Sequence, residues 1–331
     1  MAIKVAINGL GRIGRCVAKI VADRDDVELV AVNASGSDEM IQYNLKYDTV
    51  HGNRSDIEVK DGFIKIGNDK AKLLSERDPA KLNFADFGAD IVLECTGAFL
   101  TTEACQAYVD NGVKKVVMSA PAKDDTPTFV MGANEKTYAG QAIVSNASCT
   151  TNGLAPVAKV LDDAFGIEKG LMTTIHSYTA SQPILDSKHK SDPRKGRAGA
   201  TNLTPASTGA AKAIGKVMPH LNGKLNGQAI RVPTPNVSLV DLTVTLKKEA
   251  SLEDICAQFK TASEGSLKGI LGVDEEYRVS SDFIGEALST VVPLDTIQVI
   301  EGNMVKVLSW YDNEWGYSTR LVDMGVHVAT N

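Results

Sequence analysis

Cysteine is scarce in this sequence of 331 residues, and its distribution argues against a cross-linked or zinc-bound fold. The chain has five cysteines, an odd number, and they are widely spaced: Cys16, Cys95, Cys105, Cys149 and Cys256. Such spacing does not form a disulfide framework, and no Cys-x-x-Cys pair suggests zinc. We therefore expect no metal site and a reducing, cytoplasmic compartment.

Long hydrophobic runs and an excess of basic residues are also missing. No run of about 18 apolar residues occurs that would span a membrane. Residues 1–15 lack the apolar core and the cleavage site of a signal peptide. The formal net charge of −6 gives no reason to expect an acidic partner, so we expect neither nucleic acid nor a membrane.

The composition that remains is that of an ordinary globular protein. Hydrophobic residues make up 43% of the chain and charged residues 23%, which is enough for a sizeable core. A length of 331 residues suggests two domains.

Short apolar runs alternate with helical patterns in the first half of the chain. The pattern predicts a helix over 13–21 and strands over 3–7, 27–33, 91–93, 116–118 and 143–144. Runs of this length favour a parallel sheet that is covered on both faces. Residues 56–74 alternate weakly around two turn signals, which predicts an antiparallel ribbon between the two halves of that sheet.

The pattern changes after residue 148. Helical spacing continues over 154–164 and stops at Gly166, whereas residues 177–205 show little periodicity. A loop this long is usually functional or lies at an interface. Further on we expect strands over 240–246 and 305–310, and helices over 252–259 and 320–328.

Three glycines, Gly9, Gly11 and Gly14, form a G-x-G-x-x-G pattern between the first predicted strand and the first predicted helix. A tight turn and a close approach of the backbone to a pyrophosphate need residues without a Cβ, and the helix N-terminus supplies free N–H groups. Glycine turns are common, but this context makes a dinucleotide site the favoured interpretation.

The acidic residue that usually binds the ribose 2′-hydroxyl at the end of the second strand is missing. The strand is followed by Ala34 and Ser35, and the next acid is Asp38. Because a carboxylate would repel a 2′-phosphate, we hypothesise that NADP is accepted and even preferred. NAD is not excluded, since backbone groups alone can hold the ribose.

Cys149 lies in a polar stretch immediately before a predicted helix, where the helix dipole and free N–H groups stabilise a thiolate. His176, which follows a short predicted strand, is the candidate base. Spacing alone does not prove contact, and four other histidines compete: His51, His189, His220 and His327.

Five motifs occur in order along the chain: Asn8-Gly9-x-Gly11-Arg12-Ile13-Gly14-Arg15, Ser148-Cys149-Thr150-Thr151-Asn152, Ser207-Thr208-Gly209-Ala210-Ala211-Lys212, Arg231-Val232-Pro233-Thr234-Pro235-Asn236-Val237 and Trp310-Tyr311-Asp312-Asn313-Glu314. Together they are highly specific. The sequence resembles the phosphorylating glyceraldehyde-3-phosphate dehydrogenase family along essentially its whole length.

The resemblance implies an α/β Rossmann-type dinucleotide-binding domain made of residues 1–148 and 312–331. It implies an α+β catalytic domain with a mostly antiparallel sheet made of residues 149–311. It also implies a homotetramer in which the loop over 177–205 reaches the cofactor site of a neighbouring subunit.

The resemblance further implies a role for each matching residue. Cys149 matches the nucleophile and His176 its activating base. Positions that hold inorganic phosphate or a phosphate of the substrate are matched by Ser148, Thr150, Thr179, Thr208, Gly209 and Arg231. Cofactor-contacting positions outside the glycines are matched by Arg12, Ile13, Arg77, Ser119 and Asn313.

The implied reaction converts D-glyceraldehyde 3-phosphate and inorganic phosphate to 1,3-bisphosphoglycerate through a thioester on Cys149, with hydride transfer to NAD(P). Erythrose-4-phosphate dehydrogenase is the nearest alternative, but its relatives differ at two motifs that are intact here. A non-phosphorylating aldehyde dehydrogenase and an added binding role find less support.

This chain departs from the family pattern at three places. Ala34 stands where NAD-dependent members usually have Asp, and Ser187-Lys188 stands where a Leu-Pro or Gly-Pro pair is usual. Lys188 therefore offers a cation for a 2′-phosphate, which supports the NADP hypothesis independently. Gly153 replaces a common second cysteine that catalysis does not require.

Overall fold

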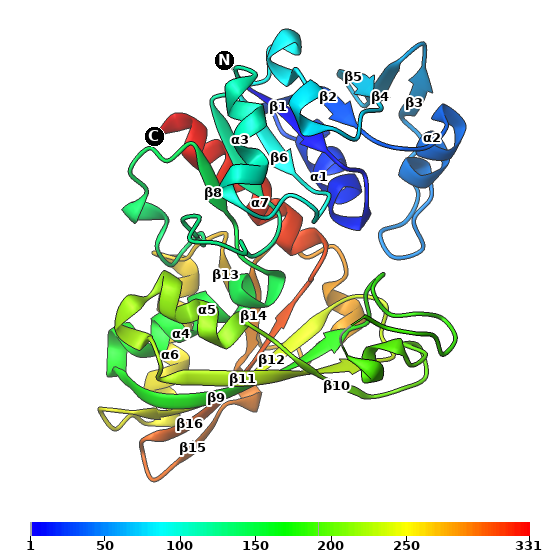
Figure 1. Cartoon of the computed structure of the whole chain (residues 1–331). Coiled ribbons are helices and arrows are strands. Elements are labelled where there is room, and N and C mark those ends of the chain that lie inside the picture. Colours follow the sequence, from blue (N-terminus) through cyan, green and yellow to red (C-terminus); the bar gives the residue numbers. More distant parts are fainter. Residues whose placement is uncertain (1, 191) are drawn as a thin grey trace. The chain divides into compact units, whose positions relative to one another are not determined.

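Two eight-stranded β-sheets organise the fold, one in each of two units of the chain (Figure 1). The computed structural model describes residues 2–190 and 192–331. The first unit comprises Met1–Ser148 and Ser318–Asn331, and the second comprises Cys149–Tyr317.

The sheet of the first unit is parallel from β5 through to β8, in the strand order β3-β4-β5-β2-β1-β6-β7-β8. Its strands are β1 (Ile3–Asn8), β2 (Val27–Asn33), β3 (Ile57–Lys60), β4 (Phe63–Ile66), β5 (Asp69–Leu74), β6 (Ile91–Glu94), β7 (Lys115–Met118) and β8 (Ile143–Ser145). Strands β6 and β8 are buried along their whole length, as expected of a sheet that is covered on both faces.

Helices cover both faces of this sheet. They are α1 (Arg12–Ala22), α2 (Asp38–Lys46), α3 (Thr102–Asp110) and the part of α7 (Trp315–Thr330) that belongs to this unit. Val92 of β6 shares a core cluster with Tyr108 of α3. A Cβ on Gly325 of α7 would instead meet the side chains of Ile91 and Leu93. Because successive strand residues point to opposite faces, α3 and α7 pack on opposite sides of β6.

The ribbon predicted over residues 56–74 is antiparallel, with β4 between β3 and β5. Its predicted place between the two halves of the sheet is wrong, because it forms one edge of the sheet beyond β2. Strand β1 pairs with β2 on one side and with β6 on the other. Strand β1 therefore has a paired strand on each side, and the two halves meet there without an intervening strand.

The sheet of the second unit is mostly antiparallel, in the order β10-β11-β9-β12-β16-β14-β13 with β15 paired to β16. Among the strand pairs of this second sheet in the described part of the chain, only β11–β9 and β13–β14 are parallel. The strands are β9 (Ile167–Ser177), β10 (Thr204–Ser207), β11 (Leu225–Val232), β12 (Ser238–Leu246), β13 (Leu271–Asp274), β14 (Thr290–Pro293), β15 (Gln298–Ile300) and β16 (Met304–Tyr311). The predicted fold class is confirmed.

One face of this second sheet is covered by helices α4 (Cys149–Phe165), α5 (Ala210–Val217) and α6 (Leu252–Glu264). Buried and partly exposed residues alternate along all of β12, which is the pattern of a sheet with one covered and one open face. On β9 the side chains of Met172, Thr174 and His176 are buried, and α4 packs against this strand. His176 therefore lies on the covered face.

Between β9 and β10 the chain forms the long irregular segment that was predicted, with one short 3₁₀ helix over Pro193–Gly196. Within residues 2–190 and 192–331, no helix has both the length and the apolar character needed to cross a membrane.

Candidate active site

A cavity of about 510 Å³ lies at the carboxyl ends of the parallel strands of the first unit. Its wall is formed by Asn8, Gly9, Leu10, Gly11, Asn33, Ala34, Ser35, Glu76, Arg77, Cys95, Thr96, Ala98 and Phe99. The carboxyl edge of a parallel sheet is where dinucleotides bind in folds of this kind.

The glycine turn forms one side of this cavity. Gly9 has a φ of 96°, in the left-handed region that favours glycine. A Cβ on Gly14 would lie 1.9 Å from the carbonyl oxygen of Gly9, so only glycine allows the turn and α1 to pack this closely. Gly11 is the N-cap of α1 and provides no side-chain cap. No side chain of the N-cap residue therefore covers the start of α1, and the residues present fit a pyrophosphate bound at this helix N-terminus.

Five of the predicted cofactor residues line the cavity, and six do not. Those that line it are Gly9, Gly11, Ala34, Ser35 and Arg77. The other six are not part of the cavity wall: Arg12, Ile13, Gly14, Ser119, Lys188 and Asn313. The guanidinium of Arg12 is paired with the carboxylate of Asp48 at 2.8 Å. Lys188 is exposed on the long loop of the second unit.

An acidic residue that the sequence did not indicate, Glu76, lines the cavity together with Ala34 and Ser35. It follows β5, and β5 is the neighbour of β2 in the sheet. Its carboxylate accepts hydrogen bonds from the backbone N–H groups of Arg77 at 2.7 Å and Asp78 at 2.9 Å. These two bonds lower the pKa of Glu76, so the side chain is ionised.

Asn8, Asn33 and Thr96 also line the cavity and were not predicted. Asn8 and Asn33 end the strands β1 and β2, and Thr96 follows β6 by two residues. The rule that ligands bind outside the carboxyl ends of parallel strands is the signal that would have found them.

In the second unit, Cys149 begins α4 and its sulfur lies 3.5 Å from Nε2 of His176. Ala147, two residues before Cys149, has a φ of 57°. This left-handed conformation strains an alanine and turns the chain sharply into the helix. The alternation of β9 places His176 on the face that α4 covers. The predicted pair is therefore brought together by the packing of one helix on one strand.

Hydrogen bonds fix the ring of His176. Its Nδ1 lies 2.7 Å from the carbonyl oxygen of Ser177. Nη1 of Arg231 also lies 2.9 Å from Nδ1. Because this nitrogen donates to the same carbonyl oxygen, and a carbonyl oxygen can only accept, we assign the proton to Nδ1, which leaves the lone pair of Nε2 facing the sulfur of Cys149. Arg231, the register partner of His176 on β11, donates to the same carbonyl at 2.9 Å.

The electrostatics of the pair favour uncharged groups. Burial raises the pKa of the Cys149 thiol, against the opposing effect of the Arg231 charge. Burial, and then the charge of Arg231, lower the pKa of His176 to about 3. The thiol and the imidazole are therefore both neutral at rest, and one proton transfer over a short distance creates the thiolate and the imidazolium.

Tyr311 completes this site and was not predicted to act in it. Its hydroxyl lies 2.9 Å from the hydroxyl of Thr150 and 2.7 Å from that of Thr174. Its ring meets the ring of His176 edge-on, with centroids 6.1 Å apart. Tyr311 therefore ties the first turn of α4 to strands β9 and β16.

Asn313 follows β16 and is buried. Its Oδ1 accepts a hydrogen bond of 2.7 Å from the hydroxyl of Ser238. This bond orients the amide so that its Nδ2 is turned the other way, as a donor.

The other predicted phosphate residues are polar groups at the starts of loops and helices. Thr208 accepts from the backbone N–H of Ala210 at 3.2 Å, and Gly209 is the N-cap of α5. The hydroxyl of Thr179 lies 2.9 Å from that of Ser181. Ser148 immediately precedes Cys149 and is partly exposed.

The competing histidines contact other groups. His220 pairs with Asp162 at 2.5 Å, and Nε2 of His327 lies 2.9 Å from the carbonyl oxygen of Glu135. Nδ1 of His189 accepts from a backbone N–H within the long loop.

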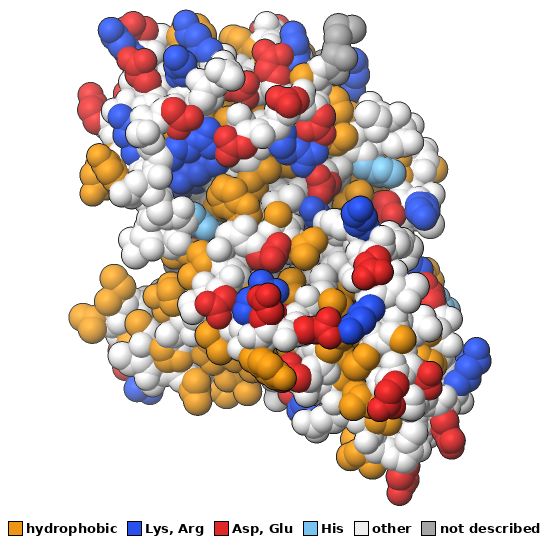
Figure 2. Space-filling view, turned by 180° about the vertical axis from the view of Figure 1, so that it is seen from behind, with side chains coloured by type: hydrophobic (Ala, Val, Ile, Leu, Met, Phe, Trp, Pro, Cys, Tyr) orange, Lys and Arg blue, Asp and Glu red, His pale blue; other side chains and the backbone are white. Residues whose placement is uncertain are grey.

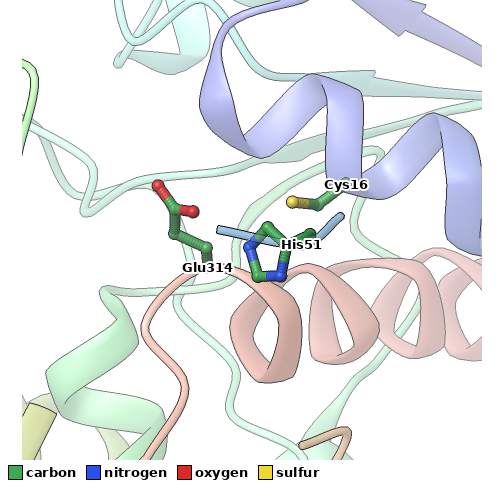
Figure 3. A group of neighbouring side chains, drawn as sticks. All are labelled: Cys16, His51 and Glu314. Carbon is green, nitrogen blue, oxygen red and sulfur yellow. The ribbon is translucent and has the colours of Figure 1, made fainter. Parts of the chain in front are cut away.

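His51, in the loop after α2, lies within 4.8 Å of the sulfur of Cys16 on α1 (Figure 3). Both residues belong to the first unit, whereas the third residue labelled in Figure 3, Glu314, belongs to the second. A structural zinc site needs four ligands, so we assign no metal to this pair.

A Rossmann-type unit with an uncapped helix at its dinucleotide cavity, and a second unit with a cysteine–histidine pair at a helix N-terminus, define the class of this protein. It is a nicotinamide-dependent dehydrogenase of the kind that works through a cysteine.

Comparison with known proteins specifies the family. Residues 3–102 match the family model "Glyceraldehyde 3-phosphate dehydrogenase, NAD binding domain", and residues 148–313 match the model of the C-terminal domain. The chain is 52% identical to glyceraldehyde-3-phosphate dehydrogenase A of Escherichia coli (strain K12), over 99% of this chain and 100% of that protein. It has the same identity and coverage with the glyceraldehyde-3-phosphate dehydrogenases of Shimwellia blattae and Salmonella typhimurium. The chain belongs to the glyceraldehyde-3-phosphate dehydrogenase family, and the resemblance seen in its sequence is confirmed.

Proposed function

We propose that this protein oxidises D-glyceraldehyde 3-phosphate to 1,3-bisphosphoglycerate, with inorganic phosphate as the second substrate and NAD or NADP as the hydride acceptor. The observation that carries this proposal is the 3.5 Å separation of Sγ of Cys149 from Nε2 of His176 at the start of α4. We assign dinucleotide binding to residues 1–148 and 312–331, and catalysis to residues 149–311.

The first step is addition of the Cys149 sulfur to the aldehyde carbon. The thiol proton passes to Nε2 of His176 and then to the oxygen of the adduct, which gives a hemithioacetal. The backbone N–H of Cys149 at the helix start would donate to that oxygen while it is negatively charged.

In the second step His176 accepts the hydroxyl proton of the hemithioacetal as a hydride leaves the same carbon, and a thioester remains on Cys149. The bound nicotinamide cofactor supplies the hydride acceptor. Gly9, Gly11 and the first N–H groups of α1 would hold its pyrophosphate, and Asn313 would orient its carboxamide.

Inorganic phosphate then attacks the thioester carbon. The carbon–sulfur bond breaks, the sulfur takes back the proton that His176 accepted, and the products are an acyl phosphate and the regenerated Cys149 thiol. We assign this phosphate to Ser148, Thr150, Thr208 and Gly209, and the substrate phosphate to Thr179 and Arg231. Hydroxyls, a backbone N–H and a guanidinium are the donors that bound phosphates require.

The experiment that tests this function is an oxidation assay of Cys149→Ser and the wild-type protein, with and without phosphate. We expect the wild-type protein to depend on phosphate and the variant to lose nearly all activity, because a hydroxyl gives up its proton to His176 far less readily than a thiol and is a weaker nucleophile. Oxidation that needs no phosphate, or that is faster with erythrose 4-phosphate, would contradict the proposal.

We further propose that NADP is accepted and even preferred over NAD. Ala34 and Ser35 leave room for a 2′-phosphate, and Arg77 lines the same cavity. The carboxylate of Glu76 in this cavity opposes a phosphate, but it is engaged by the backbone N–H groups of Arg77 and Asp78. From a neighbouring subunit, Lys188 would add a second cation.

The test compares kcat/KM for NAD and NADP in the wild-type protein and in Ala34→Asp. We expect the new carboxylate to lower kcat/KM for NADP by about a hundredfold through like-charge repulsion, with little effect on NAD. Glu76→Gln is the matched variant, and it should raise kcat/KM for NADP. A strong preference of the wild-type protein for NAD would contradict this part of the proposal.

We also propose a homotetramer in the cytoplasm. The open face of the second sheet carries a row of half-buried apolar side chains in register, Ile230, Ile175 and Leu239, with the exposed Leu171 on the same face. A second copy of the chain would cover such a face. None of the five cysteines, all of which lie in the described part of the chain, is in a disulfide, which suits a reducing compartment. The face of the molecule in Figure 2 carries interspersed basic and acidic side chains rather than a basic patch.

A further inference from the structure

Glu94 is a buried carboxylate that the chemistry above does not use. It ends β6 and has no exposed surface. One of its oxygens accepts hydrogen bonds from Nδ2 of Asn8 at 2.7 Å and from the hydroxyl of Tyr108 at 2.8 Å. The other accepts from the backbone N–H of Thr96 at 2.8 Å and from the hydroxyl of Thr96.

These four donors suit the ionised form of Glu94. All four are neutral groups, and together they occupy both oxygens. Burial raises the pKa of Glu94, but the bonds from Thr96, Asn8 and Tyr108 oppose that rise. If Glu94 were protonated, the hydrogen on its carboxyl oxygen would point at a group that already donates to that oxygen. A neutral Glu94 would therefore lose part of this set of hydrogen bonds.

The bonds continue across the sheet as a row. Asn8 is the register partner of both Asn33 and Glu94, so the last residues of β2, β1 and β6 lie side by side. Nδ2 of Asn33 donates to Oδ1 of Asn8 at 2.7 Å and to the carbonyl oxygen of Glu76 at 2.8 Å. The backbone N–H of Glu76 donates back to Oδ1 of Asn33 at 2.9 Å.

This row connects three walls of the dinucleotide cavity. One wall is the segment of Glu76, which the row holds through Asn33. A second is Thr96, which Glu94 holds through two bonds. The third is the glycine turn, since a Cβ on Gly9 would lie only 2.9 Å from Cγ2 of Thr96. Moving the Glu94 carboxylate would therefore move all three walls.

We propose that Glu94 is a positioning residue for the dinucleotide: through Thr96, Asn8 and Asn33 it holds the cavity in the form that binds the cofactor. The inference rests on dinucleotide binding by the first unit and goes beyond the residues assigned to it. A site that is already ordered loses less conformational entropy when its ligand binds.

The test uses Glu94→Gln in the full chain. An amide of the same shape places an NH₂ group where two donors now converge. We expect Kd for NADH and NADPH, measured by fluorescence titration, to rise about tenfold, which is the effect of one lost hydrogen bond to a charged group. In steady-state assays KM for the cofactor should rise by more than kcat falls.

Asp69→Asn is the matched control, because Asp69 of the same unit also accepts a backbone N–H, that of Leu29, and lies outside the cavity wall. It should leave both Kd values unchanged. Glu94→Gln with a lowered Tm and unchanged Kd values would overturn the proposal. If Glu94→Gln does not fold, Tyr108→Phe decides: it removes one donor from Glu94, and unchanged Kd values there would also overturn the proposal.

The same titration separates this inference from the proposed function. Failure of the wild-type protein to bind either dinucleotide would refute the function. Normal binding by the wild-type protein with unaltered binding by both variants would refute only the role of Glu94.

Discussion

Neighbouring groups set the tautomer and the charge of His176, the partner of Cys149 in the catalytic pair. The carbonyl of Ser177 selects the tautomer of His176, and burial, together with the charge of Arg231, lowers the pKa of the ring. The imidazole is therefore neutral and has a free lone pair on the nitrogen that faces Cys149. A neutral base beside a thiol is what the first and second steps need.

His176→Asn tests this arrangement. We expect kcat to fall by about 10² to 10⁴, the usual contribution of a general base, because the amide cannot accept the hydroxyl proton. Binding of cofactor and aldehyde should change little, since the side chain keeps a similar size. Steady-state kinetics and cofactor titration measure the two effects.

His220→Asn provides the control, because His220 is partly exposed and pairs with Asp162 away from the site. It should retain the wild-type kcat. An unchanged kcat in His176→Asn would show that another group is the base.

Cys149 and His176 were both predicted from the sequence, and Tyr311 was not. A cysteine in a polar stretch before a helix has a local signature, whereas His176 was one of five candidate histidines and was singled out by the family resemblance. Tyr311 looks like one more residue of an alternating strand. Its contact with Thr150 depends on the pairing of β16 with β12 and on the packing of α4 over both, which no local pattern encodes.

Among the elements, the start of α1 has two glycines of different importance: packing of the turn on the helix requires Gly14, and we expect cofactor binding to require Gly11. A Cβ on Gly14 would clash with the carbonyl oxygen of Gly9, whereas a Cβ on Gly11 would meet no atom of the protein within 4 Å. Gly11→Ala should therefore leave Tm unchanged and weaken cofactor binding, because the added methyl occupies the side of the cavity where the phosphates approach.

Gly14→Ala should instead destabilise the fold by about 3 kcal/mol or more, because turn and helix must separate. Thermal unfolding without cofactor and titration with NADH measure the two effects on both variants. Equal losses of stability in the two variants would contradict this division of roles.

The first residue of α1 is tied to the loop after α2 by Arg12 and Asp48. Burial alone would raise the pKa of Asp48, but Arg12 and the N–H groups of Val50 and His51 bring it down to about 2. A carboxylate whose pKa is lower in the folded state stabilises the fold above its unfolded pKa of about 4. That stabilisation is lost as the pH falls from about 4 to about 2.

Asp48→Asn should therefore lower the free energy of unfolding by about 2 kcal/mol at pH 7. The difference from the wild-type protein should vanish near the acid end of that range, as measured by urea unfolding at several pH values. Asp25→Asn, a change at an exposed carboxylate, is the control. A difference that persists at pH 2 would show that the pair acts through packing rather than charge.

Sequence periodicity predicted β1, β2, β6 to β8 and the helices α1, α4, α6 and α7, most of them within a few residues of their observed ends. It missed α2, α3 and α5, which are short helices of eight or nine residues. In helices this short, few turns repeat the apolar spacing, and packing on the sheet stabilises them more than their own propensity does.

For the whole molecule, the open face of the second sheet makes a prediction about assembly. The protein should have a solution mass four times that of its 35.2 kDa chain. Leu171→Glu, which places a charge on the exposed apolar part of that face, should shift the mass to smaller species. Light scattering coupled to gel filtration measures both.

Lys169→Glu is the control for that experiment, since it adds the same side chain on the same strand at a position that is already charged and exposed. A wild-type protein with the mass of one chain would contradict the tetramer. An unaltered mass in Leu171→Glu would place the interface elsewhere.

Local stretches of sequence were enough to predict the covered parallel sheet, the glycine turn before α1 and the cysteine at the start of α4, because each depends on residues that are close together in the chain. The tertiary structure alone decided which distant residues share a site. Glu76 joins Ala34 and Ser35 because β5 pairs with β2, and Glu94 reaches Asn33 through Asn8 because three strands end in register. Strand order and register are set by the pairing of the whole sheet, so they are absent from any local stretch of sequence.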